Sequence, residues 1–155
     1  HAKTAFRPNV ISDINFYFLF PQLWDVGLDA VYDYTKVIKH TRLNLKGRYS
    51  VTLSRTETTT DNTIHDAIKS GVNVAVVFDT KKGQDLPIKY LGHRVIDGDL
   101  TDNRFLDDKG VIVGLREKKT GNTDKTGFVV NVWISSNGDN DNSIYCYRHN
   151  EYNNI

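Results

Sequence analysis

Five apolar runs along this chain each end, reading forward, on a charged side chain. Continuous apolar runs are typical of strands that are buried on both faces of a parallel sheet. The carboxyl ends of such strands form the edge where α/β proteins build their sites. The runs are VISD, VYDYTK, SVTLSR, NVAVVFD and RVIDGD, and they end at Asp13, Lys36, Arg55, Asp79 and Asp99. The sequence therefore predicts an α/β fold with a polar rim along one edge of its sheet.

Helical patterns and turn signals separate these strands. Pro21 opens a short helical stretch, and Ile64, Ala67 and Ile68 mark one face of a helix that stops at Gly71. In the last third, the runs VIVGLRE and FVVNVWI flank a polar loop, which predicts an antiparallel hairpin. We expect one domain over residues 1–155, with a parallel β/α core over 1–110 and an antiparallel C-terminal extension over 111–155. Half of a β/α barrel is one form that this core could take.

Composition sets limits on the partners and the compartment. The formal net charge is +1, which creates no strong field towards nucleic acid or membrane. The longest apolar runs are too short to span a bilayer, and no signal peptide is recognisable, so we expect a cytoplasmic protein without a membrane partner. The single cysteine, Cys146, excludes an internal disulfide and an all-cysteine iron–sulfur cluster within the chain.

The predicted rim carries groups for two kinds of ligand. Carboxylate oxygens are the ligands that hard divalent cations such as Mg²⁺ prefer, which makes Asp13, Asp79 and Asp99 candidate metal ligands. Arginine and lysine bind phosphate, so Lys36 and Arg55, with Arg104 from a nearby acidic turn, are candidates for an anionic ligand. Each of these residues is also explained as a strand or helix end that meets water.

A basic segment follows the second of these strands. Cations interleaved with aromatic residues suit phosphate contact and base stacking, and Tyr32, Tyr34 and Tyr49 flank this segment. The simpler interpretation is a solvated charged loop. The candidate nucleic-acid contacts are Lys39, Arg42, Lys46 and Arg48.

Several of these segments also resemble a known family. VYDYTK, VTLSRTE, GVNVAVVFD and the block from VIDGD through RFLD to KGVIVGL are similar to the C-terminal half of a family found in phage, plasmid and other mobile-element genomes. The resemblance implies a partial β/α barrel, distantly similar to the radical S-adenosylmethionine architecture. The cysteine-containing N-terminal region of longer members has no counterpart here, so the resemblance implies no iron–sulfur cluster. It brings no settled activity.

Three functions fit these observations. The first is a mobile-element accessory protein that binds a phosphorylated ligand or nucleic acid at the strand ends. The second is a metal-dependent phosphodiester hydrolase, in which the aspartates hold the ion and activate water. The third is a protein-interaction module without catalysis.

Overall fold

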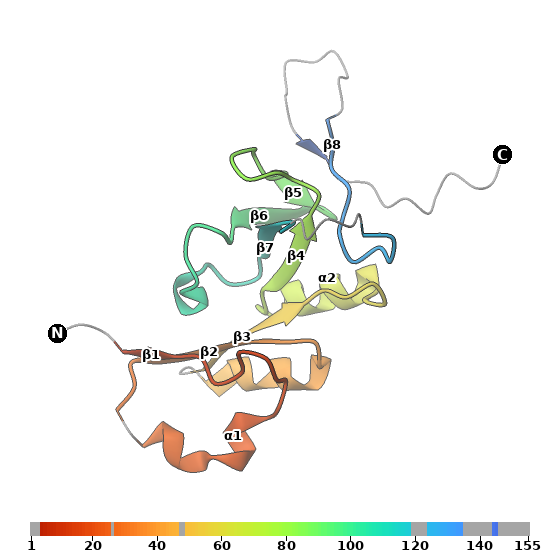
Figure 1. Ribbon diagram of the computed structural model, residues 1–155. Coiled ribbons are helices and arrows are strands. Elements are labelled where there is room, and N and C mark those ends of the chain that lie inside the picture. The colour runs from red at the N-terminus through yellow and green to blue at the C-terminus, as the bar shows by residue number, and fades with distance from the viewer. Residues whose placement is uncertain (1–3, 26, 47–48, 119–123, 135–143, 146–155) are drawn as a thin grey trace.

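A mostly parallel sheet forms the centre of the molecule (Figure 1). The computed structural model describes residues 4–25, 27–46, 49–118, 124–134 and 144–145. Within them, the larger sheet has the strand order β1-β2-β3-β4-β7-β6-β5, and only β5 runs antiparallel to its neighbour. Its strands are β1 (Ala5–Phe6), β2 (Ala30–Thr35), β3 (Tyr49–Ser54), β4 (Val74–Phe78), β5 (Lys89–Tyr90), β6 (His93–Asp97) and β7 (Ile112–Arg116). The predicted α/β class is confirmed.

Four of the five apolar runs form strands at the predicted places, and the first does not. The run that ends at Asp13 is a loop, in which Val10 and Ile11 are 70% and 100% exposed. Among the described residues, the strand that precedes it is the two-residue β1, which pairs with the start of β2. A short run offers too little apolar surface to outweigh the polar residues around it. The prediction of a strand there is wrong.

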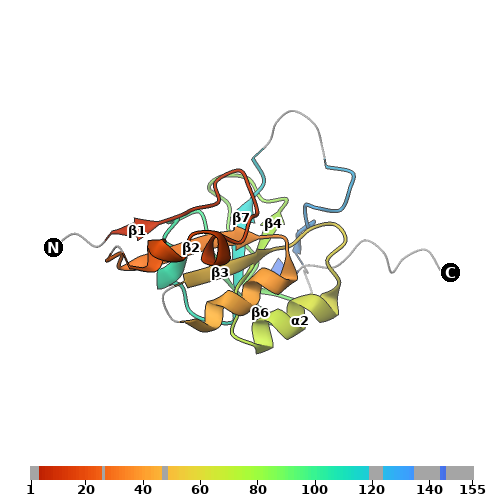
Figure 2. The same cartoon turned by 90° about the horizontal axis from the view of Figure 1, so that it is seen from below.

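One face of the sheet is covered by two helices. The 3₁₀ helix η2 (Ile38–Lys46) packs on β3, and α2 (Asp61–Lys69) packs on β4, as Figure 2 shows. The predicted face of α2 is buried, with Ile64 at 0% exposure, and Thr60 caps the first turn by accepting a hydrogen bond from Thr63 N. The connection that includes η2 was expected to be a loop. Its apolar Leu43 packs against Val31 and Val51 of the sheet, which explains why a largely polar segment becomes helical.

The edge strand β1 is followed along the chain by two short helices, whereas the main hydrophobic core lies at the central strands of the sheet. The short helices are α1 (Phe16–Leu19) and η1 (Pro21–Trp24). The main core joins β3, β4 and β7 to α2, with Val74, Ile112 and Phe78 at 0% exposure. A smaller core beside it holds Leu43 together with β2 and β3.

The opposite face of β2 and β3 is covered by the connection from β6 to β7. This connection contains the 3₁₀ helix η3 (Arg104–Leu106), which packs against β2 and β3. Phe105 lies 5.8 Å from Tyr32, measured between ring centroids. The chain then returns to place β7 between β4 and β6.

The antiparallel C-terminal hairpin lies later in the chain than expected. The strand β7 was expected to be its first arm, but β7 pairs parallel with both β4 and β6. Of the second arm, Val130 makes a parallel bridge to Phe78. The antiparallel pair is instead β8 (Trp133–Ile134) with β9 (Ile144–Tyr145). The parallel sheet therefore continues past residue 110, because the partner of β7 is decided by long-range packing and not by the adjacent polar loop.

Candidate functional site

The most developed polar arrangement of the rim lies at the carboxyl end of β2. Asp13 reaches it from the loop before α1, and its carboxylate accepts hydrogen bonds from Thr35 Oγ1 at 2.6 Å and from the backbone N–H of Lys36 at 2.6 Å. His40 Nδ1 lies 3.2 Å from the same carboxylate. Asp13 and Lys36 were both predicted for this rim, and the structure brings them together.

Asp13 is held in its charged form by these contacts. Burial acts to raise the pKa of Asp13, but the hydrogen bonds from Thr35, Lys36 N and His40 together outweigh burial and keep the pKa below its usual value. A carboxylate only accepts hydrogen bonds, so the proton between Asp13 and His40 lies on Nδ1 of the ring. In the neutral ring, Nε2 is then the acceptor nitrogen, and the His40 side chain is 21% exposed.

A row of cations continues from this point along η2. In a 3₁₀ helix, residues three apart lie on the same side, because the helix has three residues per turn. Lys39 and Arg42 therefore share one side of η2, and Lys36 precedes them by the same interval. All three are exposed. We call Lys36, Lys39 and Arg42 the basic row.

Two other candidate nucleic-acid contacts cannot be placed in this row. Arg48 lies outside the described residues, and Lys46 ends η2 without a described side chain. Tyr49 was expected to offer a stacking surface, but it is 4% exposed. Its hydroxyl donates to Asp33 at 2.9 Å, which makes it part of the core.

Asp33 lies within β2 and faces this buried network. It is 1% exposed and accepts hydrogen bonds from Asn9 N at 3.1 Å and Asn9 Nδ2 at 2.8 Å, in addition to that from Tyr49. Burial raises the pKa of Asp33 in spite of these donors. Its oxygens are directed into the protein, so Asp33 fastens the loop around Asn9 to the sheet.

Arg55, a candidate phosphate ligand, is occupied by the protein itself. Its side chain donates to the carbonyl of Phe128 at 2.7 Å and to that of Gly127 at 3.0 Å, and the residue is 5% exposed. Arg55 thus fixes the segment that follows the polar loop after β7. Arg55 follows the carboxyl end of β3, but its guanidinium is turned to these carbonyls of the protein.

Arg104, the third candidate phosphate ligand, is buried under the opposite face of the sheet. Its side chain is fully buried, donates to the carbonyl of Thr101 and lies 3.3 Å from the carboxylate of Asp107. The Nε atom has no hydrogen-bond partner among the described residues. Arg104 also lies close enough to Tyr34 to act on its pKa, which burial raises. The structure does not bring Arg104 to Lys36 at the strand ends.

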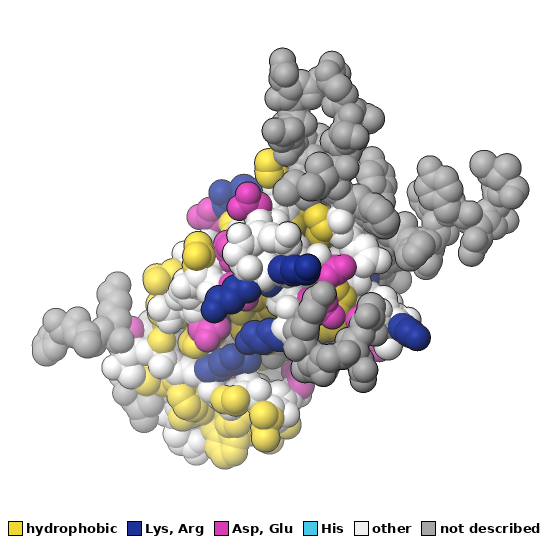
Figure 3. All heavy atoms as spheres, turned by 45° about the horizontal axis from the view of Figure 1, so that its top comes forward, with side chains coloured by type: hydrophobic (Ala, Val, Ile, Leu, Met, Phe, Trp, Pro, Cys, Tyr) yellow, Lys and Arg dark blue, Asp and Glu magenta, His cyan; other side chains and the backbone are white. Residues whose placement is uncertain are grey.

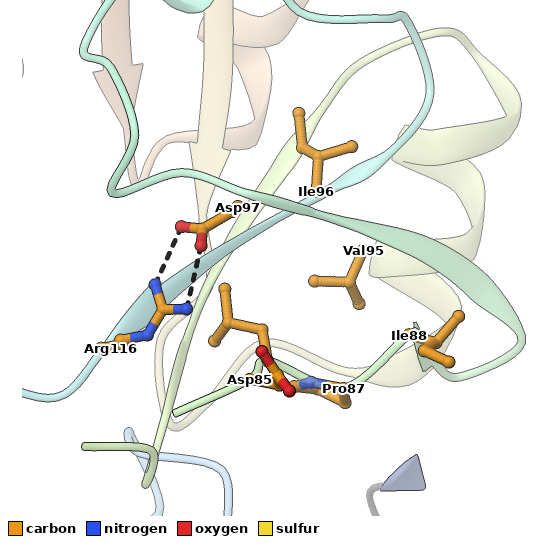
Figure 4. Close-up of a pocket in the computed structure, with 8 residues that line it drawn as sticks. Asp85, Pro87, Ile88, Val95, Ile96, Asp97 and Arg116 are labelled. Atoms are coloured by element: carbon orange, nitrogen blue, oxygen red, sulfur yellow. Dashed lines mark hydrogen bonds and ion pairs between the residues drawn. The ribbon is translucent and has the colours of Figure 1, made fainter. Parts of the chain in front are cut away.

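A second polar cluster lies at the carboxyl ends of β6 and β7. Arg116 faces both oxygens of Asp97 at 2.9 Å (Figure 4). It also lies 3.1 Å from Asp99 and donates to the carbonyl of Gln84. The hydrogen bond from Arg116 is the main cause that lowers the pKa of Asp97. A pocket of about 400 Å³ adjoins this cluster. It is lined by Asp85, Leu86, Pro87, Ile88, Val95, Ile96, Asp97 and Arg116.

The three candidate metal ligands stand apart in their contacts. Asp13 meets Thr35 and His40, whereas Asp99 meets Arg116. Asp79 is exposed, and its backbone N–H donates to Val130 O at 2.9 Å. Within the described part of the chain, no group of three or more His, Cys, Asp or Glu side chains is placed to hold a metal ion.

The residue that sequence reasoning left out is His40. It lies in the basic segment, and nothing in the local sequence shows that Asp13 folds back onto it. The spacing of three between Lys36, Lys39 and Arg42 was a readable signal of a shared side. A repeated spacing of three places residues on one side only in a 3₁₀ helix, and nothing in the sequence of this segment predicts a 3₁₀ helix.

Comparisons with known proteins identify the family but no solved relative. No curated protein and no solved structure matches the chain. In the described residues, no helix has the length and apolar character needed to cross a membrane. The family model described as Gene product 88 matches residues 1–132, which contain every strand of the larger sheet up to β7. The chain therefore belongs to the Gene product 88 family, a phage-type family.

Proposed function

We propose that this protein is a phage accessory protein that binds the phosphate groups of a nucleic acid or nucleotide at the carboxyl end of β2. The observation that carries the proposal is the basic row beside the Asp13–His40 pair. Of the predicted phosphate ligands, Lys36 is exposed, whereas Arg55 and Arg104 are buried against carbonyls of the protein. An exposed cation can exchange its water for phosphate.

The row is suited to a chain of phosphates. Lys36 follows the end of β2, and Lys39 and Arg42 share one side of η2, so the three cations offer successive contacts, and lysine and arginine both bind phosphate. His40 stands beside the first of them, with Nδ1 turned to Asp13.

The direct test is fluorescence anisotropy with labelled oligonucleotides over a range of salt concentrations. Three phosphate contacts give a slope of log K against log salt of about −2 for a single strand. The variant Lys39→Gln/Arg42→Gln leaves one contact, so it should reduce the slope to about −0.7 and weaken binding at low salt by at least about tenfold. Lys81 and Lys82 are exposed lysines in the loop after β4 and do not belong to the row, so Lys81→Gln/Lys82→Gln is the charge-matched control.

The outcomes distinguish binding at the basic row from non-specific binding to any exposed basic residues. If the control variant weakens binding as much as the row variant does, the contact is non-specific and the proposed site is wrong. If unlabelled ATP or inorganic phosphate displaces the oligonucleotide at equal phosphate concentration, the ligand is a single phosphate group and not a polymer. If no oligonucleotide or nucleotide binds at low salt, the proposed function is wrong.

Two finer predictions stay open beside this proposal. A divalent metal held by Asp13, Asp79 and Asp99 would serve a phosphodiester hydrolase, and magnesium-dependent cleavage in the same oligonucleotide assay would reveal it. The distant likeness to the radical S-adenosylmethionine barrel stays a prediction about the architecture. Neither is needed for phosphate binding by the basic row.

A further inference from the structure

We infer that the polymer bound by the basic row is single-stranded nucleic acid, and that the exposed aromatic rings of α1 stack with its bases. The inference rests on the proposed function, because it places the phosphates on the basic row and adds a surface for the bases. We call Phe18 and Phe20 the aromatic pair.

The aromatic pair belongs to an unusually exposed apolar surface. Phe18 is 73% exposed, Phe20 is 46% exposed, and Leu19 between them is 58% exposed. In the space-filling view, hydrophobic side chains gather at the lower end of the molecule, where Figure 1 places α1 and η1 (Figure 3). Large exposed apolar surface on a soluble protein marks a place where something binds.

The rings are held by neighbouring aromatic residues. Phe20 lies 5.1 Å from Phe16, measured between ring centroids, with the ring planes tilted by 30°. Phe18 lies 5.6 Å from Tyr17 in an edge-to-face arrangement. The edge-to-face contact restrains Phe18, and its 73% exposure leaves most of the side chain accessible. A base can therefore stack on a ring whose orientation is already restricted.

The aromatic pair and the basic row lie on neighbouring elements. Figures 1 and 2 both place α1 beside η2. Tyr17 packs against the small core that contains Leu43 of η2, and Asp13, shortly before α1, bonds to Lys36. Val37 and Ile38, where η2 begins, are exposed apolar residues as well. Aromatic rings beside a line of cations are the arrangement that binds single strands without sequence preference.

A single strand fits these observations better than a lipid surface does. Basic and apolar residues together also suit an anionic membrane. However, the exposed carboxylates of Asp25 and Asp29 lie on the same short stretch of chain as α1 and η1. A flat anionic surface would meet them, whereas a strand follows a narrow track and can pass them by. A duplex would also keep its bases stacked internally and leave the rings of the aromatic pair without partners.

The test compares a labelled single strand, its duplex and phosphatidylserine vesicles as ligands of the full chain. Base stacking on aromatic side chains is lost when the ring is removed, so Phe18→Leu/Phe20→Leu should weaken single-strand binding at least about tenfold. The leucines keep the surface apolar. Duplex affinity should change less than about twofold, and Phe18→Tyr/Phe20→Tyr should retain single-strand binding. Leu106→Ala is the control, because Leu106 is 67% exposed on η3, away from α1.

Each outcome tests the single-strand inference, the proposed function or both. Equal affinity for single strand and duplex, unchanged by the leucine variant but weakened by Lys39→Gln/Arg42→Gln, overturns the inference and leaves the proposed function in place. Binding to the vesicles that depends on Phe18 and Phe20, without binding to oligonucleotides, overturns both. Thermal melting of each variant verifies that a loss of binding does not come from a loss of fold.

Discussion

Asp13 should contribute more to stability than its position in an exposed loop suggests. We predict that Asp13→Ala destabilises the protein by about 3 kcal/mol. Hydrogen bonds to a charged group contribute roughly 1.5 to 3 kcal/mol each, and Asp13 accepts two of 2.6 Å from Thr35 and Lys36, with His40 at 3.2 Å. The low end of this range applies to each of the two hydrogen bonds, because the Asp13 side chain is 29% exposed and water can replace part of the lost hydrogen bonding.

Urea denaturation followed by circular dichroism measures this effect. A loss of this size lowers the midpoint by about 1 to 2 M urea, and the melting temperature by roughly 6 to 12 °C. Asp66→Ala is the control, because Asp66 is an exposed carboxylate on α2, and it should change the midpoint very little. An Asp13→Ala midpoint equal to that of the control would refute the reasoning that this carboxylate organises the carboxyl end of β2.

The same carboxylate makes a prediction about pH. The pKa of Asp13 is lower in the folded protein than its ordinary value of 3.8, so the folded state favours the charged form. Its contribution is therefore fully present above pH 3.8 and is lost as the pH falls through the lower, folded value. The difference in stability between the wild-type protein and Asp13→Ala should shrink in that acidic range. A constant difference from pH 7 down to the acid transition would contradict the assignment.

Two further substitutions test the buried contacts around the site. Arg55→Ala removes the donors to the carbonyls of Gly127 and Phe128, so we expect faster amide exchange over residues 124–130 while β4 and α2 stay protected; unchanged exchange there would mean that other contacts hold the segment. Tyr49→Phe removes a donor from the buried carboxylate of Asp33 and should cost about 2 kcal/mol in urea denaturation, whereas a loss below about 0.5 kcal/mol would show that Asn9 alone satisfies that carboxylate.

The sequence predicted well those parts of the fold that depend on local patterns. The strands β3 and β4 and the helix between them follow from β-branched runs, a helical apolar face and a glycine stop. Their order in a parallel sheet also follows, because the connection between β3 and β4 is a short crossover through α2. The placement of β7 between β4 and β6 does not follow, since it depends on which strand edge is open after the earlier strands have paired.

In the candidate site, too, the sequence predicted what depends on local patterns and not what depends on long-range contacts. Lys36 lies where a strand end was predicted, because the strand itself was recognisable. Asp13 reaches the same edge for a different reason, since its run is a loop that folds back and bonds to Thr35. Arg55 and Arg104 carry the right charge in the sequence, but their direction is decided by distant carbonyls at Gly127, Phe128 and Thr101. A charged residue in a sequence does not show whether the protein itself will be its partner.

Mapping the ligand by nuclear magnetic resonance tests the central claim most directly. The backbone amides of the uniformly labelled protein are followed while a short single-stranded oligonucleotide is added at low salt. We predict that the largest shift changes occur at Lys36, Lys39, His40 and Arg42, and that the amides around Phe18 follow them. Changes concentrated instead around Asp97 and Arg116, or changes too small to saturate, would contradict the claim that phosphate binds at the carboxyl end of β2.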